Sequence, residues 1–259
     1  MKPPGTDAHL AGAGRTGVLV LSGSSGRVER QRCDVLAAGL DVTALSYRWF
    51  DLVLDRVPLE SFEEPLAWLH ERCDRLVVLG TSRGAEAALL LGSLHAEVDA
   101  VVAVSPSHVV WAALSDRRPQ TSSWTRGGEP LPFVPYDDDW VPPTDPPEYV
   151  GQYHSALARF ADRVPAARIP VERIAGEVVL SSGGDDRLWP AGAYADEIAR
   201  RRAAYGLDTV ALHEPAAGHR VLLPGETPQP ARLVHGGTPA ADAALGTRLW
   251  SELVRLTGR

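Results

Sequence analysis

The segment around Ser82 constrains the fold of this 259-residue chain more than any other. A short apolar run, residues 76–79, is followed by Gly80-Thr81-Ser82-Arg83-Gly84 and then by residues 85–91, which have helical composition. A G-x-S-x-G turn between a strand and a helix holds its serine in strained geometry at the edge of a sheet. The glycines remove side chains that would clash where strand and helix nearly touch. The pattern predicts Ser82 as a nucleophile; the alternative is a glycine-bounded helix start capped by Ser82.

Short apolar runs alternate with amphipathic segments along most of the chain. Strands are expected at residues 18–21, 41–45, 76–79, 101–104, 178–180 and 209–212, and helices at 28–38, 62–72, 85–91, 193–204 and 240–256. Short apolar strands that alternate with helices indicate a mostly parallel sheet covered on both faces. Active sites of such sheets lie at the carboxyl ends of the strands. The candidate functional loops are therefore those after Leu21, Leu79, Val104, Leu180 and Leu212.

The composition excludes several classes of function. With 44% hydrophobic and 23% charged residues, a net charge of -7 and a pI of about 5.6, the chain is typical of soluble globular proteins. The acidic balance disfavours a nucleic-acid partner, and no apolar run approaches the ~18 residues of a membrane span. The two cysteines, Cys33 and Cys73, have no metal-ligand or disulfide spacing. We expect buried free thiols in helical segments, and a cytoplasmic location.

Two regions fall outside the alternation of strands and helices. Residues 1–16 are rich in Gly, Ala and Pro and lack a continuous apolar run, so we expect a flexible tail and no signal peptide. Residues 17–259 are expected to form one domain. Within it, about residues 112–170 are rich in Pro, Asp and Trp. A loop this long is usually a lid or a binding loop, so we expect a cap over the site; the alternative is a surface excursion without a role in binding.

A serine nucleophile needs a base and a carboxylate that orients the base. In this arrangement the expected chain order is Ser, then Asp or Glu, then His. Asp185 and Asp186 follow a late strand, and we prefer Asp186 because it lies shortly before Pro190, the expected first residue of the next helix. Asp185 would then hold the loop. His219, in a Gly-containing loop after the last strand, is the candidate base, whereas His213 at a strand end is expected to be structural.

Acyl chemistry on a serine also needs N–H donors for the developing oxyanion. The backbone N–H of Arg83 would be one donor, and the small-residue loop 22–26 would provide the other. Ser24 is preferred for this second donor over Ser25; the alternative is a plain strand–helix turn. Ser25 and Trp189 are candidate substrate-binding residues.

A metal site is not expected. The acidic run 137–139 and the pair Asp185 and Asp186 have no accompanying His or Cys residues at ligand spacing. The acidic run is therefore expected to be solvated surface, and no cofactor is predicted.

Several stretches together resemble the α/β-hydrolase domain of acyl-CoA thioesterases and bile acid-CoA:amino acid N-acyltransferases, a domain similar to dienelactone hydrolases. The resemblance covers roughly residue 17 to the C-terminus. It rests on the elbow with its long apolar helix and on residues 20–26 (VLSGSSG), 101–107 (VVAVSPS), 169–174 (IPVERI), 183–190 (GGDDRLWP), 217–219 (AGH) and 236–238 (GGT). It implies an α/β-hydrolase fold, with a mostly parallel central sheet flanked by helices and a cap inserted after the strand at 101–104.

The resemblance also implies a Ser82–Asp186–His219 triad that acts on an acyl thioester, such as an acyl-CoA. Ser82 would attack the carbonyl to form an acyl-enzyme, which water or an amine would resolve. The expected partner is therefore a small-molecule acyl thioester or ester, without nucleic acid or membrane. Two other functions stay open: carboxylester hydrolysis or acyl transfer on the same triad, and a non-catalytic hydrolase fold that binds a small molecule.

Overall fold

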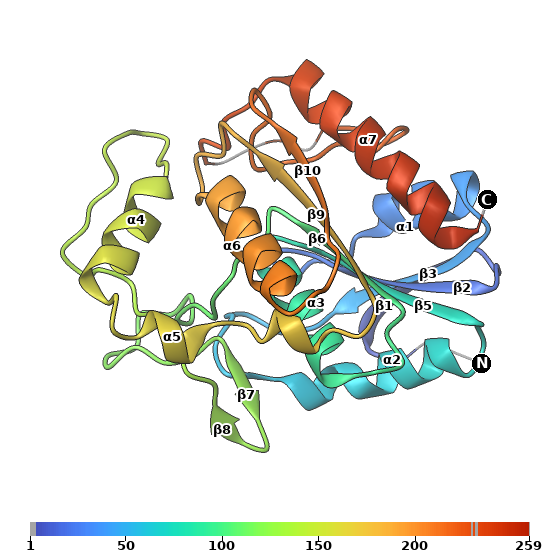
Figure 1. The fold of residues 1–259 in the computed structure, drawn as a ribbon, viewed down its shortest axis with the longest axis horizontal. Coiled ribbons are helices and arrows are strands. Elements are labelled where there is room, and N and C mark those ends of the chain that lie inside the picture. The colour runs from blue at the N-terminus through green and yellow to red at the C-terminus, as the bar shows by residue number, and fades with distance from the viewer. Residues whose placement is uncertain (1–3, 229, 231–232, 259) are drawn as a thin grey trace.

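The computed structural model describes residues 4–228, 230 and 233–258. At its centre is a seven-stranded sheet with the order β1-β3-β2-β5-β6-β9-β10 (Figure 1). β1 pairs antiparallel with β3, and all other neighbours pair parallel, which confirms the predicted mostly parallel sheet. The strands of this sheet are Thr6–Ala11 (β1), Thr16–Leu21 (β2), Val42–Arg48 (β3), Arg75–Thr81 (β5), Ala100–Val104 (β6), Glu177–Gly183 (β9) and Val210–Glu214 (β10).

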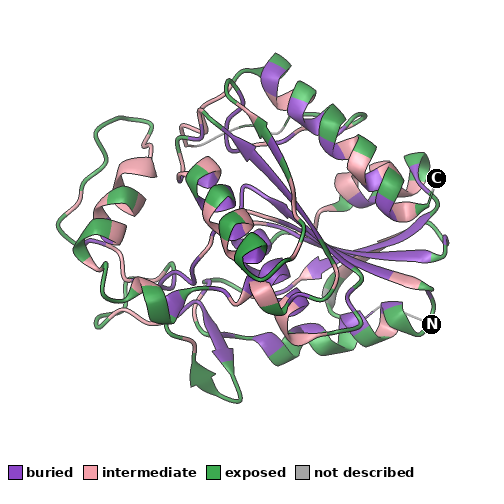
Figure 2. Cartoon of the chain, viewed as in Figure 1, coloured by how far each residue is buried: buried purple, intermediate pink, exposed green. Residues whose placement is uncertain are grey.

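Helices cover both faces of this sheet, because alternate side chains of each strand point to opposite faces. In β2, Val18 and Val20 belong to the buried cluster that includes α1 and α7, whereas Leu19 and Leu21 belong to the cluster with α2, α3 and α6. Most strand residues are therefore buried (Figure 2), which explains their continuous apolar runs. The helices are Arg30–Gly39 (α1), Glu63–His70 (α2), Arg83–Leu94 (α3), Ala191–Ala204 (α6) and Pro239–Thr257 (α7).

The strand order reverses between β2 and β5. From β2 the chain moves to β3 on one side, whereas β5, β6, β9 and β10 follow one another on the other side. In open parallel sheets the loops that leave such a pair of strands diverge and form a crevice in which ligands bind. Ser22 follows β2 and Ser82 follows β5, so both loops lie at this crevice.

The N-terminal region differs from the prediction. Residues 6–11 form β1, in which His9 pairs with Ser46 and Ala11 with Ala44 of β3. The expected flexible tail is therefore wrong for these residues. An edge strand gains backbone hydrogen bonds from one neighbour only and stays partly exposed, so it needs no continuous apolar run.

The segment 112–170 lies between β6 and β9 and has elements of its own, at the left and lower edge of Figure 1. They are β7 (Trp124–Arg126), β8 (Glu129–Pro130), α4 (Val150–Arg159) and α5 (Val164–Ala167). β7 pairs with β8 and with β4 (Val57–Pro58) in a second sheet. The 3-10 turns Leu59–Phe62 (η1) and Val171–Arg173 (η2) precede α2 and β9. Strands of two or three residues are too short to show periodicity in the sequence.

Both cysteine thiols are buried and free, as predicted. Cys33 lies in α1, where burial raises the pKa of its thiol to about 12. Cys73 follows the end of α2 and precedes β5, so its predicted helical position is wrong. In the described part of the chain, no helix has both the length and the apolar character of a membrane span.

Candidate active site

Ser82 occupies the turn between β5 and α3, with backbone angles φ 58° and ψ -118°. A positive φ is strained for a residue with a side chain, and such strain recurs at functional sites. A Cβ on Gly80 would lie 2.0 Å from the carbonyl oxygen of Gly84, and a Cβ on Gly84 would lie 2.2 Å from that of Ser22. Strand, helix and the loop after β2 therefore approach so closely that only glycine fits at both flanking positions.

Contacts on both sides hold the elbow in place. The Ser82 N–H donates to the carbonyl oxygen of Val104 at the end of β6, at 2.8 Å. On the other side, Arg32 of α1 donates from Nη1 to Thr81 Oγ1 at 3.0 Å and from Nε to Glu226 at 2.6 Å. The side chains of Arg32 and Glu226 are 11% and 7% exposed, so water screens this ion pair little. No motif in the sequence predicts a role for Arg32 or Glu226.

Asp186 and His219 form a buried hydrogen-bonded pair. Nδ1 of His219 lies 2.7 Å from Oδ2 of Asp186. The other carboxylate oxygen of Asp186 accepts the backbone N–H groups of Leu188 and Trp189, at 2.9 and 3.2 Å. Because these donors lie just downstream in the same loop, the loop itself orients the carboxylate toward His219.

Asp185 faces away from His219. Its Oδ2 accepts the backbone N–H of Gly237 at 2.9 Å, and its Oδ1 accepts Nε of Arg187 at 2.7 Å. The Gly237 N–H, together with Arg187, lowers the pKa of Asp185. Asp185 thus ties the loop to the segment before α7, and of the two aspartates it is Asp186 that contacts His219.

The end of β6 connects the elbow with His219. While Val104 accepts the Ser82 N–H, the hydroxyl of Ser105 donates to the carbonyl oxygen of His219 at 2.9 Å. Within the described residues, Ser82 Oγ forms no hydrogen bond with His219. The two residues therefore lie at the same edge of the sheet without being joined. Hydrogen bonds between nucleophile and base often tighten only when substrate binds.

Two rings flank the His219 imidazole. The centroids of the His235 and His219 rings lie 5.9 Å apart, and the backbone N–H of His219 donates to the His235 carbonyl oxygen at 3.0 Å. Burial, with Arg220 and His219 nearby, lowers the pKa of His235 to about 4. His235 is therefore a neutral neighbour of His219 near pH 7. On another side the Trp189 ring meets His219 edge-on, with centroids 5.8 Å apart.

The loop 22–26 lies directly against Ser82. A Cβ on Gly23 would lie 3.2 Å from Cβ and 3.7 Å from Oγ of Ser82. The N–H of Gly26 closes the turn onto the carbonyl oxygen of Gly23 at 3.1 Å, and Ser24 and Ser25 are exposed at its tip. The loop is thus next to Ser82, while the roles of Ser24 and Ser25 stay predictions.

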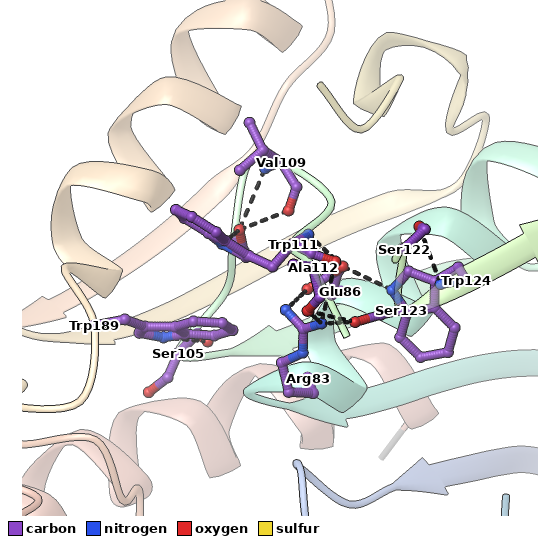
Figure 3. Close-up of polar contacts among 11 residues, drawn as sticks. Arg83, Glu86, Ser105, Val109, Trp111, Ala112, Ser122, Ser123, Trp124 and Trp189 are labelled. Carbon is purple, nitrogen blue, oxygen red and sulfur yellow. Dashed lines mark hydrogen bonds and ion pairs between the residues drawn. The ribbon is translucent and has the colours of Figure 1, made fainter. Parts of the chain in front are cut away.

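The side chain of Arg83 forms a buried ion pair with Glu86 (Figure 3). Nη1 and Oε2 lie 2.7 Å apart, and the side chains are 2% and 0% exposed. Burial raises the pKa of Glu86, and Arg83 opposes that shift. Burial also disfavours the charge on Arg83, but the Glu86 carboxylate leaves the pKa of Arg83 raised. The elbow pattern predicts a role only for the backbone of Arg83, whereas a Glu three residues after an Arg in an apolar helix is the sequence signal for the ion pair.

The ion pair binds residues 111–124, called here the 111–124 segment. Nη2 of Arg83 donates to the carbonyl oxygen of Ala112 at 3.1 Å and to Oγ of Ser123. Oε1 of Glu86 accepts the backbone N–H of Trp111 at 3.1 Å and Nε1 of Trp124 at 2.7 Å. Further hydrogen bonds help to stabilise the charges of a buried ion pair, and the partners of Arg83 Nη2 and Glu86 Oε1 come from the 111–124 segment. Nε of Arg83 has no hydrogen-bond partner among the described residues.

Trp189 joins His219 to the segment 112–170. Its Nε1 donates to the carbonyl oxygen of Ser105 at 3.1 Å, and its side chain is only 2% exposed. The ring packs against Tyr153 of α4 at 5.5 Å and against Tyr194 of α6 at 6.1 Å. Trp189 is thus part of a buried aromatic cluster, and its predicted contact with substrate stays a prediction.

A cavity of about 510 Å³ lies between α4 and α6. Its walls include His108, His154 of α4, and Tyr194 and Arg200 of α6, but neither Ser82, Asp186 nor His219. The rings of Tyr194, Trp189 and His219 follow one another from the cavity to the site. Two aromatic layers therefore separate the cavity from His219.

The acidic run 137–139 is partly internal. Asp137 is 9% exposed and accepts hydrogen bonds from Ser155 and Arg159 of α4. The predicted solvated surface is therefore wrong for Asp137, whereas Asp138 and Asp139 are exposed. Over the ranges that the structure describes, no group of three or more His, Cys, Asp or Glu side chains could hold a metal ion.

Curated proteins with similar sequences are acyl-coenzyme A thioesterases. Mouse mitochondrial acyl-coenzyme A thioesterase 2 is 26% identical over 268 residues, which cover 92% of this chain and 53% of that protein. Mouse acyl-coenzyme A thioesterase 1 is 26% identical over 266 residues, which cover 92% and 58%. The chain thus spans little more than half the length of these curated relatives.

Solved structures share the fold at lower identity. A putative dienelactone hydrolase from Klebsiella pneumoniae matches with a TM-score of 0.55 at 12% identity, over 97% of this chain and 92% of that chain. A structure described as a lipase in its open form matches with a TM-score of 0.54 at 13% identity, over 97% and 94%. Together with the parallel sheet and its helices, these matches confirm the α/β-hydrolase fold; at this identity they say nothing about the reaction.

The family model described as BAAT / Acyl-CoA thioester hydrolase C terminal matches residues 57–257. The matched range contains Ser82, Asp186 and His219 as well as the segment 112–170. The resemblance predicted from the sequence is confirmed: this chain belongs to the family of BAAT / acyl-CoA thioester hydrolase C-terminal domains.

Proposed function

We propose that this chain is a serine hydrolase that cleaves acyl thioesters through an acyl-enzyme on Ser82. The observation that carries the proposal is the 2.7 Å hydrogen bond between His219 Nδ1 and Asp186, at the same sheet edge as the strained Ser82 elbow. A histidine oriented in this way through Nδ1 can use Nε2 as the base for a serine. The family and the thioesterase names of the relatives support a thioester as the substrate.

In the first half-reaction the base makes the serine a nucleophile. His219 takes the proton of Ser82 Oγ as the oxygen attacks the thioester carbonyl, and Asp186 stabilises the imidazolium. The backbone N–H groups of Arg83 and Ser24 stabilise the oxyanion of the tetrahedral intermediate. The C–S bond then breaks, the acyl group stays on Ser82 and the thiol leaves with the proton from His219. A thiol, with a pKa near ~8.5, is a far better leaving group than an alcohol.

In the second half-reaction the same groups act on water. His219 takes a proton from a water molecule that attacks the acyl-enzyme carbonyl, and Ser82 leaves with that proton. The products are a carboxylic acid and the free serine. An amine or an alcohol in place of water would give acyl transfer on the same triad.

We assign the selection of the acyl group and of its carrier to residues around the triad. The segment 112–170 would act as a cap within a single domain of residues 17–259, and Trp189 and Ser25 would line the substrate site. Trp189 supports this assignment because it contacts both His219 and Tyr153 of the segment. The cytoplasmic location stays a prediction, since one relative is mitochondrial.

A thiol-release assay with a panel of acyl-CoA and acyl-N-acetylcysteamine thioesters tests the proposal, with p-nitrophenyl esters in parallel. We expect thioester turnover, and a loss of at least ~10³-fold in kcat for Ser82→Ala, as for other triad enzymes. Ester turnover without thioester turnover would replace the thioesterase by a carboxylesterase. Activity that survives Ser82→Ala would refute the triad, and saturable binding without any turnover would indicate a non-catalytic fold.

A further inference from the structure

Two buried tryptophans connect the start of α3 with the loop after β2. Nε1 of Trp124 donates to Oε1 of Glu86 at 2.7 Å (Figure 3). The Trp124 ring stacks on Trp49, with centroids 5.4 Å apart and an interplanar angle of 17°. Nε1 of Trp49 in turn donates to Oγ of Ser22 at 3.2 Å. Glu86, Trp124, Trp49 and Ser22 thus form a continuous series of contacts, called here the tryptophan bridge.

The two ends of the tryptophan bridge are the two sides of the proposed oxyanion site. Glu86 is paired with Arg83, whose backbone N–H is the first proposed donor. Ser22 begins the loop that carries the second proposed donor, Ser24. This loop lies against the nucleophile, since a Cβ on Gly23 would be 3.2 Å from the Ser82 Cβ. The bridge therefore runs from the helix that carries the first proposed donor to the loop that carries the second.

The hydrogen bonds of the bridge go beyond what core packing requires. Trp49 and Trp124 are 4% and 0% exposed, so a phenylalanine ring would bury much of the same apolar surface. A buried indole N–H usually has an acceptor, and in both residues that acceptor belongs to a segment beside Ser82. Next to Trp49, the Phe50 ring packs where a Cβ on Gly26 would be, 2.6 Å from the nearest ring carbon. The loop after β2 is therefore held at both of its ends.

We propose that Trp49 and Trp124 are positioning residues that set the distance between the loop 22–26 and the start of α3, and with it the spacing of the two oxyanion donors. This inference rests on the proposed function, because it assumes that Ser82 attacks a carbonyl. An oxyanion site acts only when its donors lie within hydrogen-bond distance of the developing charge, about 2.7–3.1 Å. A small displacement of one wall therefore affects the transition state more than substrate binding.

Trp49→Phe and Trp124→Phe test the inference, since each removes one N–H and keeps an aromatic ring. The probe is an alkyl fluorophosphonate, which needs no knowledge of the natural substrate. Ser82 Oγ attacks phosphorus, the P–F bond breaks, fluoride leaves and His219 takes the serine proton. The phosphoryl oxygen occupies the oxyanion site. Intact-mass measurement of labelling at several probe concentrations separates kinact from KI.

We expect kinact to fall about 10- to 100-fold in each variant, less than the loss of a whole donor, with KI within twofold of wild type. Ser22→Ala should have the effect of Trp49→Phe, and the double variant Ser22→Ala/Trp49→Phe should be no slower than either single variant. The matched control is Trp68→Phe on α2. Trp68 packs against the same core, but its indole N–H has no acceptor among the described residues, so kinact should stay at the wild-type value.

The outcomes separate this inference from the proposed function. If Ser82→Ala abolishes labelling while Trp49→Phe and Trp124→Phe label at the wild-type rate, the bridge has no positioning role and the function stands. A fall in kinact that Trp68→Phe reproduces, or an equal rise in KI, would mean that general packing is responsible. If wild type is not labelled, or Ser82→Ala is labelled equally, the proposed function fails and the inference fails with it.

Discussion

The acid loop at residues 183–190 contacts His219, the 111–124 segment contacts the helix that begins after Ser82, and the two regions are held in place by different kinds of contact. In the acid loop, Asp186 accepts the N–H groups of Leu188 and Trp189, two and three residues away. In the 111–124 segment, Trp111 and Trp124 bond to Glu86, which is 25 and 38 residues away. The acid loop is held by backbone groups of its own turn, whereas the 111–124 segment is held by an ion pair in a helix that is distant in sequence.

Because of this difference, substitutions in the two regions should have different effects, on the reaction in one and on stability in the other. The Asp186 carboxylate is held by the backbone of a loop that ends a strand, so changing its charge should alter the reaction more than the fold. The Arg83–Glu86 pair is itself the anchor of the 111–124 segment, so breaking it leaves a charge and several donors unsatisfied inside the protein. Substitutions there should alter stability first.

The largest effect is expected for Asp186→Asn. Asn keeps an oxygen for the loop N–H groups but cannot stabilise the His219 imidazolium, so kcat for thioester hydrolysis should fall on the order of 10³–10⁴-fold. The melting temperature should change little. Asp185→Asn is the matched control, because Asp185 binds Gly237 and Arg187 instead of His219, and it should lose less than about 10-fold. Equal losses in the two variants would show that the contact to His219 is not what distinguishes them.

The next effect concerns the 111–124 segment. Glu86→Gln leaves the Arg83 charge unpaired in the interior, and removing one partner of a buried pair costs about 3–5 kcal/mol of unfolding free energy. Urea denaturation, followed by tryptophan fluorescence, measures this loss. The double variant Arg83→Met/Glu86→Gln removes the charge and keeps an acceptor for Trp111 and Trp124, so it should be more stable than Glu86→Gln alone. A double variant less stable than Glu86→Gln would contradict the assigned anchor role of the charge pair.

The smallest effect is expected at His108, which follows β6 and borders the cavity between α4 and α6. Burial, opposed by Glu197 and supported by Arg168 and Arg200, lowers its pKa from 6.5 to about 4. Between these pH values the unfolded chain takes up a proton that the folded protein does not. Stability should therefore fall as the pH drops from 6.5 toward 4, by about 1–2 kcal/mol at pH 5 from this residue.

His108→Gln removes that proton uptake, so the decrease in melting temperature between pH 7.5 and pH 5 should become smaller. His70→Gln on the exposed side of α2 is the matched control and should leave the decrease unchanged. Burial also lowers the pKa of His235, and this residue is present in both variants. Part of the decrease in melting temperature should therefore persist. An identical pH dependence in His108→Gln and wild type would mean that His108 takes up its proton in the folded state as well.

Except for β1, the strands of the central sheet and the helices that cover it could be predicted because each has its own periodic or apolar signal. β5 and β6, for instance, are short apolar runs since both of their faces are buried. β1 could not be predicted, because an edge strand is defined by backbone pairing with β3 rather than by its side chains. The short strands β7 and β8 were missed because two or three residues show no periodicity; β7 pairs with β4, which is far away in the sequence, and β8 pairs with β7.

The residues of the candidate site likewise divide into those that the sequence predicts and those that it does not. Ser82, Asp186 and His219 each follow a strand, so their order and spacing were visible along the chain. The side chain of Arg83 was missed, although its backbone was considered, because its partners Glu86 and Ser123 acquire meaning only when α3 meets the 111–124 segment. Arg32 and Glu226, which support Thr81 beside the nucleophile, are likewise 194 residues apart.

The sequence alone determined the α/β class, the elbow at Ser82 and the loops that carry Asp186 and His219, because turns and buried strands are specified by nearby residues. The tertiary structure decided that Asp186 rather than Asp185 contacts His219, and that a buried ion pair and two tryptophans join the elbow helix to the loop beside it. Such contacts depend on which distant segments share the interior, where low polarity makes each unsatisfied charge or donor costly. No local pattern encodes that choice of partners.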